Sequence, residues 1–213
     1  MYFSSNLDEI SNIIKKGGVA LLQVDTIFGL ICNGVDDDAI KKIENIKNRN
    51  KPAFGFFVKD ISVARKYVKF NQIQEDCFNK VFPGYFTLIL EANDNAIKSI
   101  PQRALGEKIV NSIKIKTMGL RVPKNDFCLK LLEYFDYPLV ATSANISGKN
   151  TATKFEEINE NIIEQADVVY YNNQAPIAGL SSTIVDITDV DNSKIIRNGS
   201  GDINLLKDFL LFK

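Results

Sequence analysis

The sequence predicts an α/β protein built on a twisted, mixed sheet of parallel and antiparallel strands that is covered by helices. Helical and strand patterns alternate from the beginning of the chain. Strand patterns at 168–171, 183–187 and 194–197 follow one another too closely for the helical crossovers that parallel strands need. No linker rich in Pro, Gly and Ser and no internal repeat divides the 213 residues, so we expect one domain spanning 1–213.

Hydrophobic spacing places the individual elements. The first helix covers 7–14, where apolar residues form one stripe, and Asn6 or Ser5 caps it. The later elements are expected as a strand at 19–24, a helix through 39–46, a strand at 54–58, a helix through 73–81, strands at 87–91 and 118–122, a helix through 127–135, a strand at 139–142, a helix at 154–164, the three strands above and a last helix near 203–211. Residues 92–116 have the least pattern and are expected to form a mobile loop.

Composition and charge narrow the class of protein. Lys plus Arg and Asp plus Glu balance at 26 each, so no net field draws the chain to nucleic acid or a membrane. No apolar run approaches the roughly 18 residues of a membrane span, and the first residues lack a signal-peptide pattern. The three cysteines are far apart and without CxxC spacing, which argues against disulfides and zinc. We therefore expect a cytoplasmic protein.

The absence of histidine limits the available chemistry. It removes the commonest general base and the commonest metal ligand. The phosphate signatures GxxxxGK[ST] and GxGxxG are also absent, so neither a P-loop nor a dinucleotide site is indicated. What remains are short polar and basic clusters, most of them at strand ends.

One basic cluster is KNR at 47–49, in a segment, 41–69, where basic residues outnumber acidic ones. Most lysines of this segment fit solvated helix faces. Lys47 and Arg49 themselves either complement the dipole at the end of a helix or bind different oxygens of one polyphosphate.

The other clusters are polar loops and two arginines. ATSANISG at 141–148 follows an apolar strand and supplies either ordinary turn and capping groups or a nest of N–H groups and hydroxyls for an anion. Ser181 and Ser182 open a later strand in the same style, and Arg121 and Arg197 stand at strand ends. These cations and hydroxyls suit phosphoryl or nucleotidyl transfer, in which Mg²⁺ arrives with the nucleotide and no protein-held metal is expected.

Seven motifs, taken in chain order, resemble the YrdC/Sua5 family of threonylcarbamoyl-AMP synthases. They are DTIFGL (25–30), KNR (47–49), PGYFTLIL (83–90), TMGLRVP (117–123), ATSANISG (141–148), SSTIVD (181–186) and IIRNG (195–199). The chain is similar to the short form of the family, without the additional C-terminal domain of longer Sua5 proteins. The resemblance implies a YrdC-like fold.

It also implies a nucleotidyltransferase that converts L-threonine, bicarbonate and ATP into threonylcarbamoyl-AMP and pyrophosphate, for N6-threonylcarbamoyladenosine (t6A) in tRNA. A downstream tRNA threonylcarbamoyl-transferase complex is the expected partner, and direct tRNA binding is expected to be weak or indirect. The implied ATP contacts are Lys47, Arg49, Ser143, Asn145, Thr151 and Arg197, with Lys47 and Arg49 as the catalytic pair that neutralises departing pyrophosphate. The implied threonine contacts are Thr26, Thr117, Arg121 and Ser182, with Arg121 as the fork for the carboxylate.

Part of the first motif departs from the family pattern. Gln23 and Val24 precede Asp25-Thr26 where the family usually has Pro-Thr, and Phe28 replaces a Tyr. Substrate choice in the threonine pocket is therefore left open by the sequence. Residues 92–116 are a candidate lid that would exclude water from a labile carbamate.

Two other functions compete with synthesis of the adenylate. The basic segment 41–69 is compatible with an RNA-binding module, although balanced charge and the lack of a basic and aromatic platform disfavour it. A carbamoyl-transfer domain like that of hydrogenase maturation proteins is disfavoured by the short length.

Overall fold

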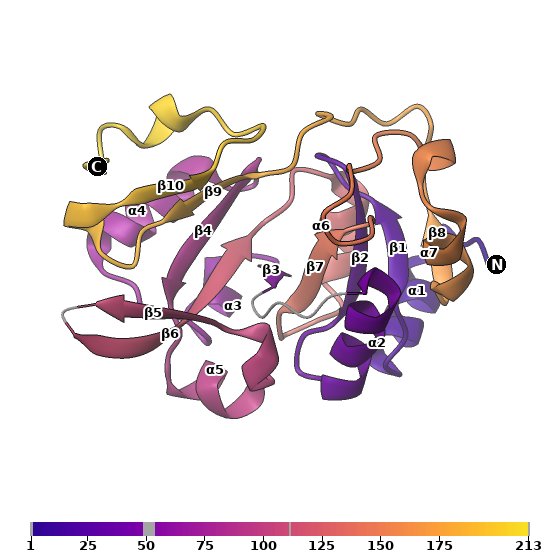
Figure 1. Ribbon diagram of the computed structural model, residues 1–213, viewed down its shortest axis with the longest axis horizontal. Helices are drawn as coiled ribbons and strands as arrows, with labels where there is room; N and C mark the ends of the chain where they lie inside the picture. The colour runs from indigo at the N-terminus through magenta and orange to yellow at the C-terminus, as the bar shows by residue number, and fades with distance from the viewer. Residues whose placement is uncertain (1, 49–53, 111, 213) are drawn as a thin grey trace.

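The computed structural model describes residues 2–48, 54–110 and 112–212 (Figure 1). The strands are β1 (Ala20–Gln23), β2 (Phe28–Asn33), β3 (Gly55–Phe57), β4 (Phe86–Glu91), β5 (Gly106–Val110), β6 (Ile113–Arg121), β7 (Leu139–Ser143), β8 (Val168–Tyr170), β9 (Thr183–Asp186) and β10 (Lys194–Arg197). The α-helices are α1 (Leu7–Lys15), α2 (Asp37–Lys47), α3 (Ile61–Ala64), α4 (Gln72–Val81), α5 (Asp94–Ser99), α6 (Asp126–Leu132) and α7 (Glu160–Gln165). Short 3₁₀ turns are η1 (Gln102–Ala104), η2 (Phe155–Glu157), η3 (Val190–Asn192) and η4 (Ile203–Leu206).

The described strands form one sheet in the order β10-β9-β4-β6-β3-β7-β2-β1-β8, and β5 pairs with β6. The pairs β1–β8, β3–β6 and β4–β9 are parallel. The pairs β1–β2, β2–β7, β3–β7, β4–β6, β5–β6 and β9–β10 are antiparallel. The expected mixed α/β sheet is confirmed.

Helix ends follow from local capping chemistry. Asn6, rather than Ser5, caps α1, because its side-chain oxygen accepts hydrogen bonds from the N–H groups of Asp8 and Glu9 at 2.9 and 3.3 Å. Gly17 then ends the helix in the left-handed region with φ 80°. The α4 helix begins with a reciprocal capping box between Asn71 and Gln74.

Several expectations were wrong in detail. Residues 92–116 are not a loop, because they form α5, η1, β5 and the start of β6. The helix expected at 154–164 is divided into η2 and α7, since Asn159 caps a new helix through the N–H of Asn161 at 3.1 Å. The last helix is reduced to η4, and β2 lay in a motif for which no strand was expected.

Alternation along the strands divides the apolar side chains between two cores. On one face, α1 and α6 pack against Leu22, Ile31 and Phe57. On the other face, α2, α4 and α7 pack against a larger core that includes Leu30 and Phe56. Since α1 and α6 cover only one end of the first face, the middle of that face is left for a site.

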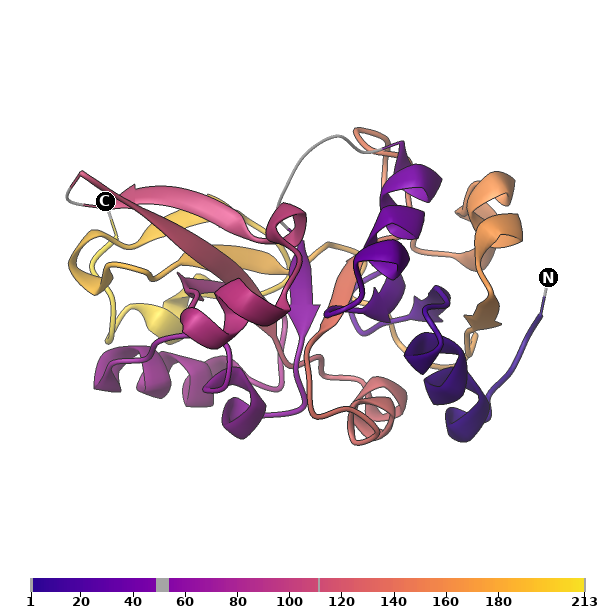
Figure 2. The same cartoon turned by 90° about the horizontal axis from the view of Figure 1, so that it is seen from below.

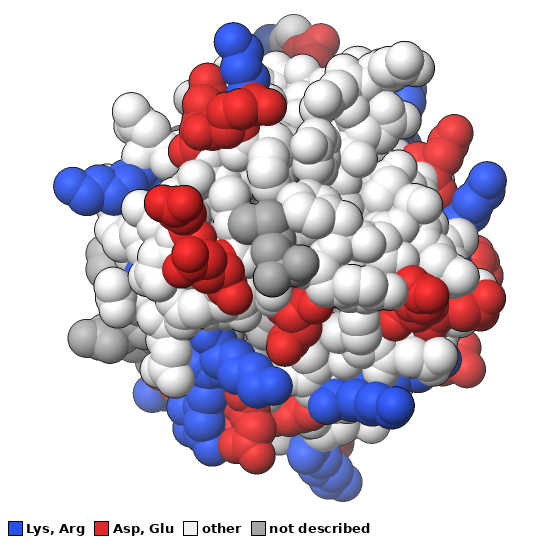
Figure 3. Space-filling model, turned by 90° about the vertical axis from the view of Figure 1, so that its right-hand side faces the viewer, with Lys and Arg blue, Asp and Glu red and all other residues white. Residues whose placement is uncertain are grey.

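The cysteines and the surface charges agree with what the composition predicts. Cys32, Cys77 and Cys128 are free thiols and all are buried. The face of the molecule in Figure 3 carries Lys and Arg interspersed with Asp and Glu. In the described ranges, no helix is long and apolar enough to cross a membrane.

Candidate active site

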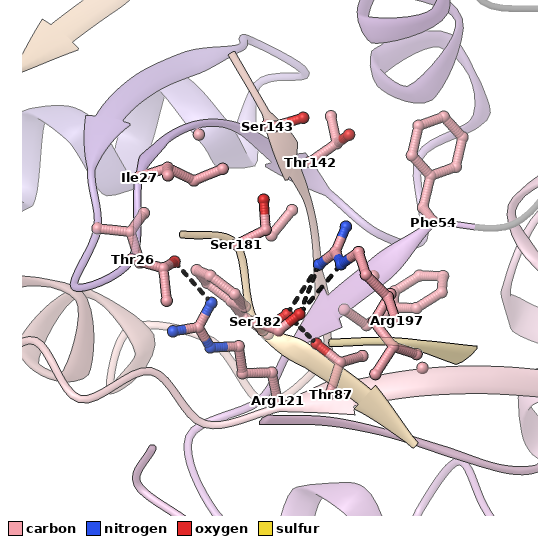
Figure 4. A pocket seen from close by; sticks show the side chains of 18 of the residues that line it. Thr26, Ile27, Phe54, Thr87, Arg121, Thr142, Ser143, Ser181, Ser182 and Arg197 are labelled. Carbon is pink, nitrogen blue, oxygen red and sulfur yellow. Dashed lines mark hydrogen bonds between the residues drawn. The ribbon is translucent and has the colours of Figure 1, made fainter. Parts of the chain in front are cut away.

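A cavity of about 310 Å³ lies on the sheet face that α1 and α6 leave uncovered (Figure 4). Its floor is the sheet itself. Gly119 of β6 pairs with Gly55 of β3, which pairs with Ala141 of β7, so three neighbouring strands present almost no side chain at this level. Ile89 and Ile31 stand at the two ends of the same row. The row therefore makes a trough bounded by apolar side chains.

The structure brings six of the sequence-predicted residues to this one cavity. They are Thr26, Thr117, Arg121, Ser143, Ser182 and Arg197. They come from five of the seven motifs, which are far apart in the chain, and alternation along β6 and β7 aims Thr117, Arg121 and Ser143 at the same face. The binding role of each stays a prediction.

Arg121 is part of a buried ion pair. Its Nη2 donates to Asp25 Oδ1 at 2.6 Å, its Nη1 to Thr26 Oγ1 at 2.9 Å and its Nε to the Gly84 carbonyl at 3.1 Å. The other Asp25 oxygen accepts from the N–H of Lys124 at 2.8 Å. Burial lowers the pKa of Arg121, while the adjacent Asp25 carboxylate opposes that shift. The charge of Arg121 is thus matched inside the protein, and only part of its five-donor fork is left for a ligand.

Arg197 differs from Arg121 in having no carboxylate partner among the described residues. Its Nε and Nη2 donate to the Ser182 carbonyl at 3.1 and 2.8 Å, and Nη2 also contacts Ser182 Oγ at 3.2 Å. Desolvation and then the positive charge of Arg121 lower the pKa of Arg197. This arginine therefore supplies the cavity with positive charge that Asp25 does not neutralise.

Lys47 lies beside the cavity and holds one of its walls. The side chain is 2 % exposed, and its Nζ donates to the carbonyls of Ser143 and Asn145, the latter at 2.7 Å, and to Asn145 Oδ1 at 3.2 Å. The N–H of Ser147 donates in turn to the Lys47 carbonyl at 3.1 Å. These hydrogen bonds join the end of α2 to the polar loop after β7.

Two of the other predicted residues that the structure describes, Thr151 and Asn145, do not line the cavity. Arg49 lies outside the described residues. Asn145 accepts a hydrogen bond from the hydroxyl of Ser143, which does line the cavity.

Several lining residues were missed from the sequence, among them Thr87, Ile89 and the floor glycines. Thr87 Oγ1 lies 2.8 Å from Ser182 Oγ and extends the polar network around Arg197. The signal for Thr87 was the period of two in β4, which places it on the same face as Ile89. Val24 and Phe28, the two residues of the first motif that differ from the family pattern, also line the cavity.

Adding a methyl group to the floor should weaken ligand binding without unfolding the protein. A Cβ on Gly119 would lie 3.1 Å from Thr87 Cγ2 and would occupy the trough. One methyl group in a pocket changes discrimination by about 10- to 200-fold, so Gly119→Ala should raise the KM of a bound substrate by about tenfold or more. Thermal unfolding should show little change, because alanine suits a strand better than glycine does.

The Gly119→Ala/Thr87→Ser double variant is the control for strain. It removes the 3.1 Å contact but keeps the added methyl group in the trough. Recovery of the wild-type KM in this double variant would show that crowding between the added methyl group and Thr87, and not obstruction of the ligand by the added methyl group alone, caused the effect.

A family model of Sua5, YciO and YrdC, described as "Telomere recombination", matches residues 12–199. The chain belongs to this family. The uncharacterized protein YciO of Escherichia coli is 29% identical over 202 residues, covering 92% of this chain and 90% of YciO. The threonylcarbamoyl-AMP synthase of Pyrococcus abyssi is 27% identical over 183 residues, covering 84% of this chain but 50% of that protein. The family thus includes relatives named for a synthase and relatives with no named activity.

Solved structures of the family share the fold. The crystal structure of E. coli YciO has a TM-score of 0.79 and 27% identity, with 98% of this chain and 97% of that chain covered. The crystal structure of P. abyssi Sua5 complexed with L-threonine has a TM-score of 0.81 and 22% identity, covering 97% of this chain and 58% of that chain. These comparisons confirm the YrdC-like fold.

Proposed function

We propose that the protein is a threonylcarbamoyl-AMP synthase, a nucleotidyltransferase that uses L-threonine, bicarbonate and ATP. The observation that carries the proposal is the convergence of six motif residues on one cavity of about 310 Å³. That volume lies at the lower end of the roughly 300–1,000 Å³ of small-molecule sites. The names of relatives in the family support the same reaction.

The two sides of the cavity suit the two substrates. Thr26, Thr117 and Arg121 lie on the side where the amino acid would bind. Ser143, with Lys47 and Asn145 behind it, lies on the side where the phosphates of ATP would bind. Arg197 reaches the cavity from β10 and offers a cation to the negative charge that develops between them.

In the proposed reaction, the threonine amine adds to bicarbonate and loses water to give a carbamate. A carbamate oxygen then forms a bond to the α-phosphorus of ATP, and the bond from that phosphorus to the pyrophosphate oxygen breaks. Mg²⁺ travels with the nucleotide. The protein contributes alignment of the two reactants and stabilisation of the charge that moves to pyrophosphate, with Lys47, Arg49 and Arg197 as the expected cations.

The product would pass to a tRNA threonylcarbamoyl-transferase complex in the cytoplasm. In the described part of the basic segment 41–69, several cations are paired with carboxylates, such as Arg65 with Glu75 at 2.6 Å and Lys69 with Glu91 at 2.5 Å. This pairing leaves little free positive charge there for RNA. We therefore propose that the protein contacts tRNA indirectly, through that complex.

Pyrophosphate release by the full chain tests the proposal. With ATP and Mg²⁺, release should require both L-threonine and bicarbonate, and mass spectrometry should detect threonylcarbamoyl-AMP. L-Serine and L-valine, each lacking one feature of threonine, are matched substrates that should react more slowly. Pyrophosphate release that is indifferent to threonine and to bicarbonate would contradict the function, and tight, salt-sensitive tRNA binding in that case would favour an RNA-binding module.

A further inference from the structure

One ion pair joins two strands that are not neighbours in the sheet. Lys108 Nζ of β5 lies 2.7 Å from Asp186 Oδ2 of β9 and donates to Thr188 Oγ1 at 2.6 Å. The Thr188 hydroxyl and N–H both donate to the other Asp186 oxygen, at 2.6 and 3.0 Å. The side chains of Lys108 and Asp186 are 24% and 9% exposed, so this pair is more shielded than most of the other ion pairs described.

The pair requires the sheet to curl. Along the ladder, β5 is followed by β6, β4 and β9. Three steps of about 4.8 Å each would separate β5 from β9 in a flat sheet, which is farther than one lysine side chain reaches. The contact between Lys108 and Asp186 therefore closes the end of a strongly coiled sheet, where the β5–β6 and β9–β10 hairpins lie at the same end of the molecule (Figures 1 and 2).

The cavity lies on the face toward which the sheet curls. Gly106, two residues before Lys108, and Ile184, two residues before Asp186, both line the cavity, so the charged side chains stand on the same face. Gly106 pairs with Thr117, which is an implied threonine contact. The ion pair thus borders the end of the cavity at which the amino acid is expected.

We propose that Lys108 and Asp186 form a positioning pair that sets the width of the amino-acid end of the cavity, and that this pair determines how tightly L-threonine is held. The assignment rests on the proposed function. Neither residue touches the reacting atoms. Each acts through the strand that carries it, Lys108 through Gly106 and Asp186 through Ile184.

The experiment compares Lys108→Met with Lys116→Met. Lys116 lies on the same hairpin, is also paired with a carboxylate and is similarly exposed at 25%, but pairs with Glu107 away from β9. Lys108→Met should raise the KM for L-threonine about tenfold or more, with the KM for ATP unchanged, whereas Lys116→Met should change neither. Lys108→Arg should restore the KM for threonine because it keeps the charge and the reach.

Amide hydrogen exchange without substrates provides a readout that is independent of activity. Lys108→Met should speed exchange in both 106–110 and 183–187. Lys116→Met should speed exchange in the β5–β6 hairpin alone. If Lys108→Met folds poorly because Asp186 is left unpaired, the Lys108→Met/Asp186→Asn double variant removes both charges.

Two results would overturn the proposal. One is that Lys108→Met, or the double variant, shows the same amide exchange rates or the same KM for L-threonine as Lys116→Met. The other is that the KM for ATP rises as much as the KM for threonine. A wild-type protein without threonine-dependent pyrophosphate release would contradict the proposed function, and the exchange comparison would still decide whether the pair holds β5 to β9.

Discussion

Replacing Arg121 by methionine is expected to lower the free energy of unfolding by about 3–5 kcal/mol, because it leaves the Asp25 carboxylate buried without its cation. Asp25 is 4 % exposed and Arg121 5 %, so solvent cannot replace the lost contact. Activity should be lost in the folded fraction as well, since Arg121 lines the cavity. Urea-induced unfolding followed by circular dichroism measures the change.

The Asp25→Leu/Arg121→Met double variant separates the two consequences. Removing both charges should recover most of the lost stability, since no buried charge is left unpaired. It should not recover activity. A single Arg121→Met protein with wild-type stability would show that the ion pair contributes little, and a fully active double variant would remove Arg121 from the site.

Replacing Arg197 by methionine is expected to lower turnover strongly while leaving folding almost unchanged. Removal of one preorganised donor from a site of developing charge typically costs about 10²–10³ in kcat, and Arg197 lines the cavity without a carboxylate partner in the described ranges. Stability should change by about 0.5 kcal/mol or less, as for other exposed positions. Steady-state pyrophosphate release and thermal unfolding are the two measurements.

Arg197→Lys is the matched control for charge without the planar fork. Lysine keeps the positive charge but cannot donate from two nitrogens to the Ser182 carbonyl, so partial activity is expected. Full activity in Arg197→Met would show that the arginine only supports the loop at Ser182.

The sequence predicted the mixed sheet because its strands have strong local patterns. β1, β4 and β7 are short apolar runs between turn signals, and such runs are read without knowledge of their neighbours. β5 was missed because GEKIV has one weak alternation with two charges in it. Pairing with β6 stabilises this strand, and pairing between strands is not visible in a local pattern.

The site was predicted as a set of residues and not as an arrangement. Strand ends and polar loops pointed to Ser143, Ser182, Arg121 and Arg197, which do meet at one cavity. Nothing in the local sequence shows that Asp25 neutralises Arg121, since the two are far apart in the chain and the pairing arises from tertiary structure. The trough was missed for a similar reason, because Gly55 and Gly119 become a floor only when β3 and β6 pair.

The hydrogen bonds from Lys47 to the loop after β7 restrict which substitutions members of this family can accept. Lys47 donates to both carbonyls and to the side chain within 143–145, so the end of α2 and this loop behave as one unit. A substitution in either segment alters the hydrogen-bond partners of the other. Among relatives, therefore, the two segments should vary together, and a change at position 47 should be accompanied by a compensating change near position 145.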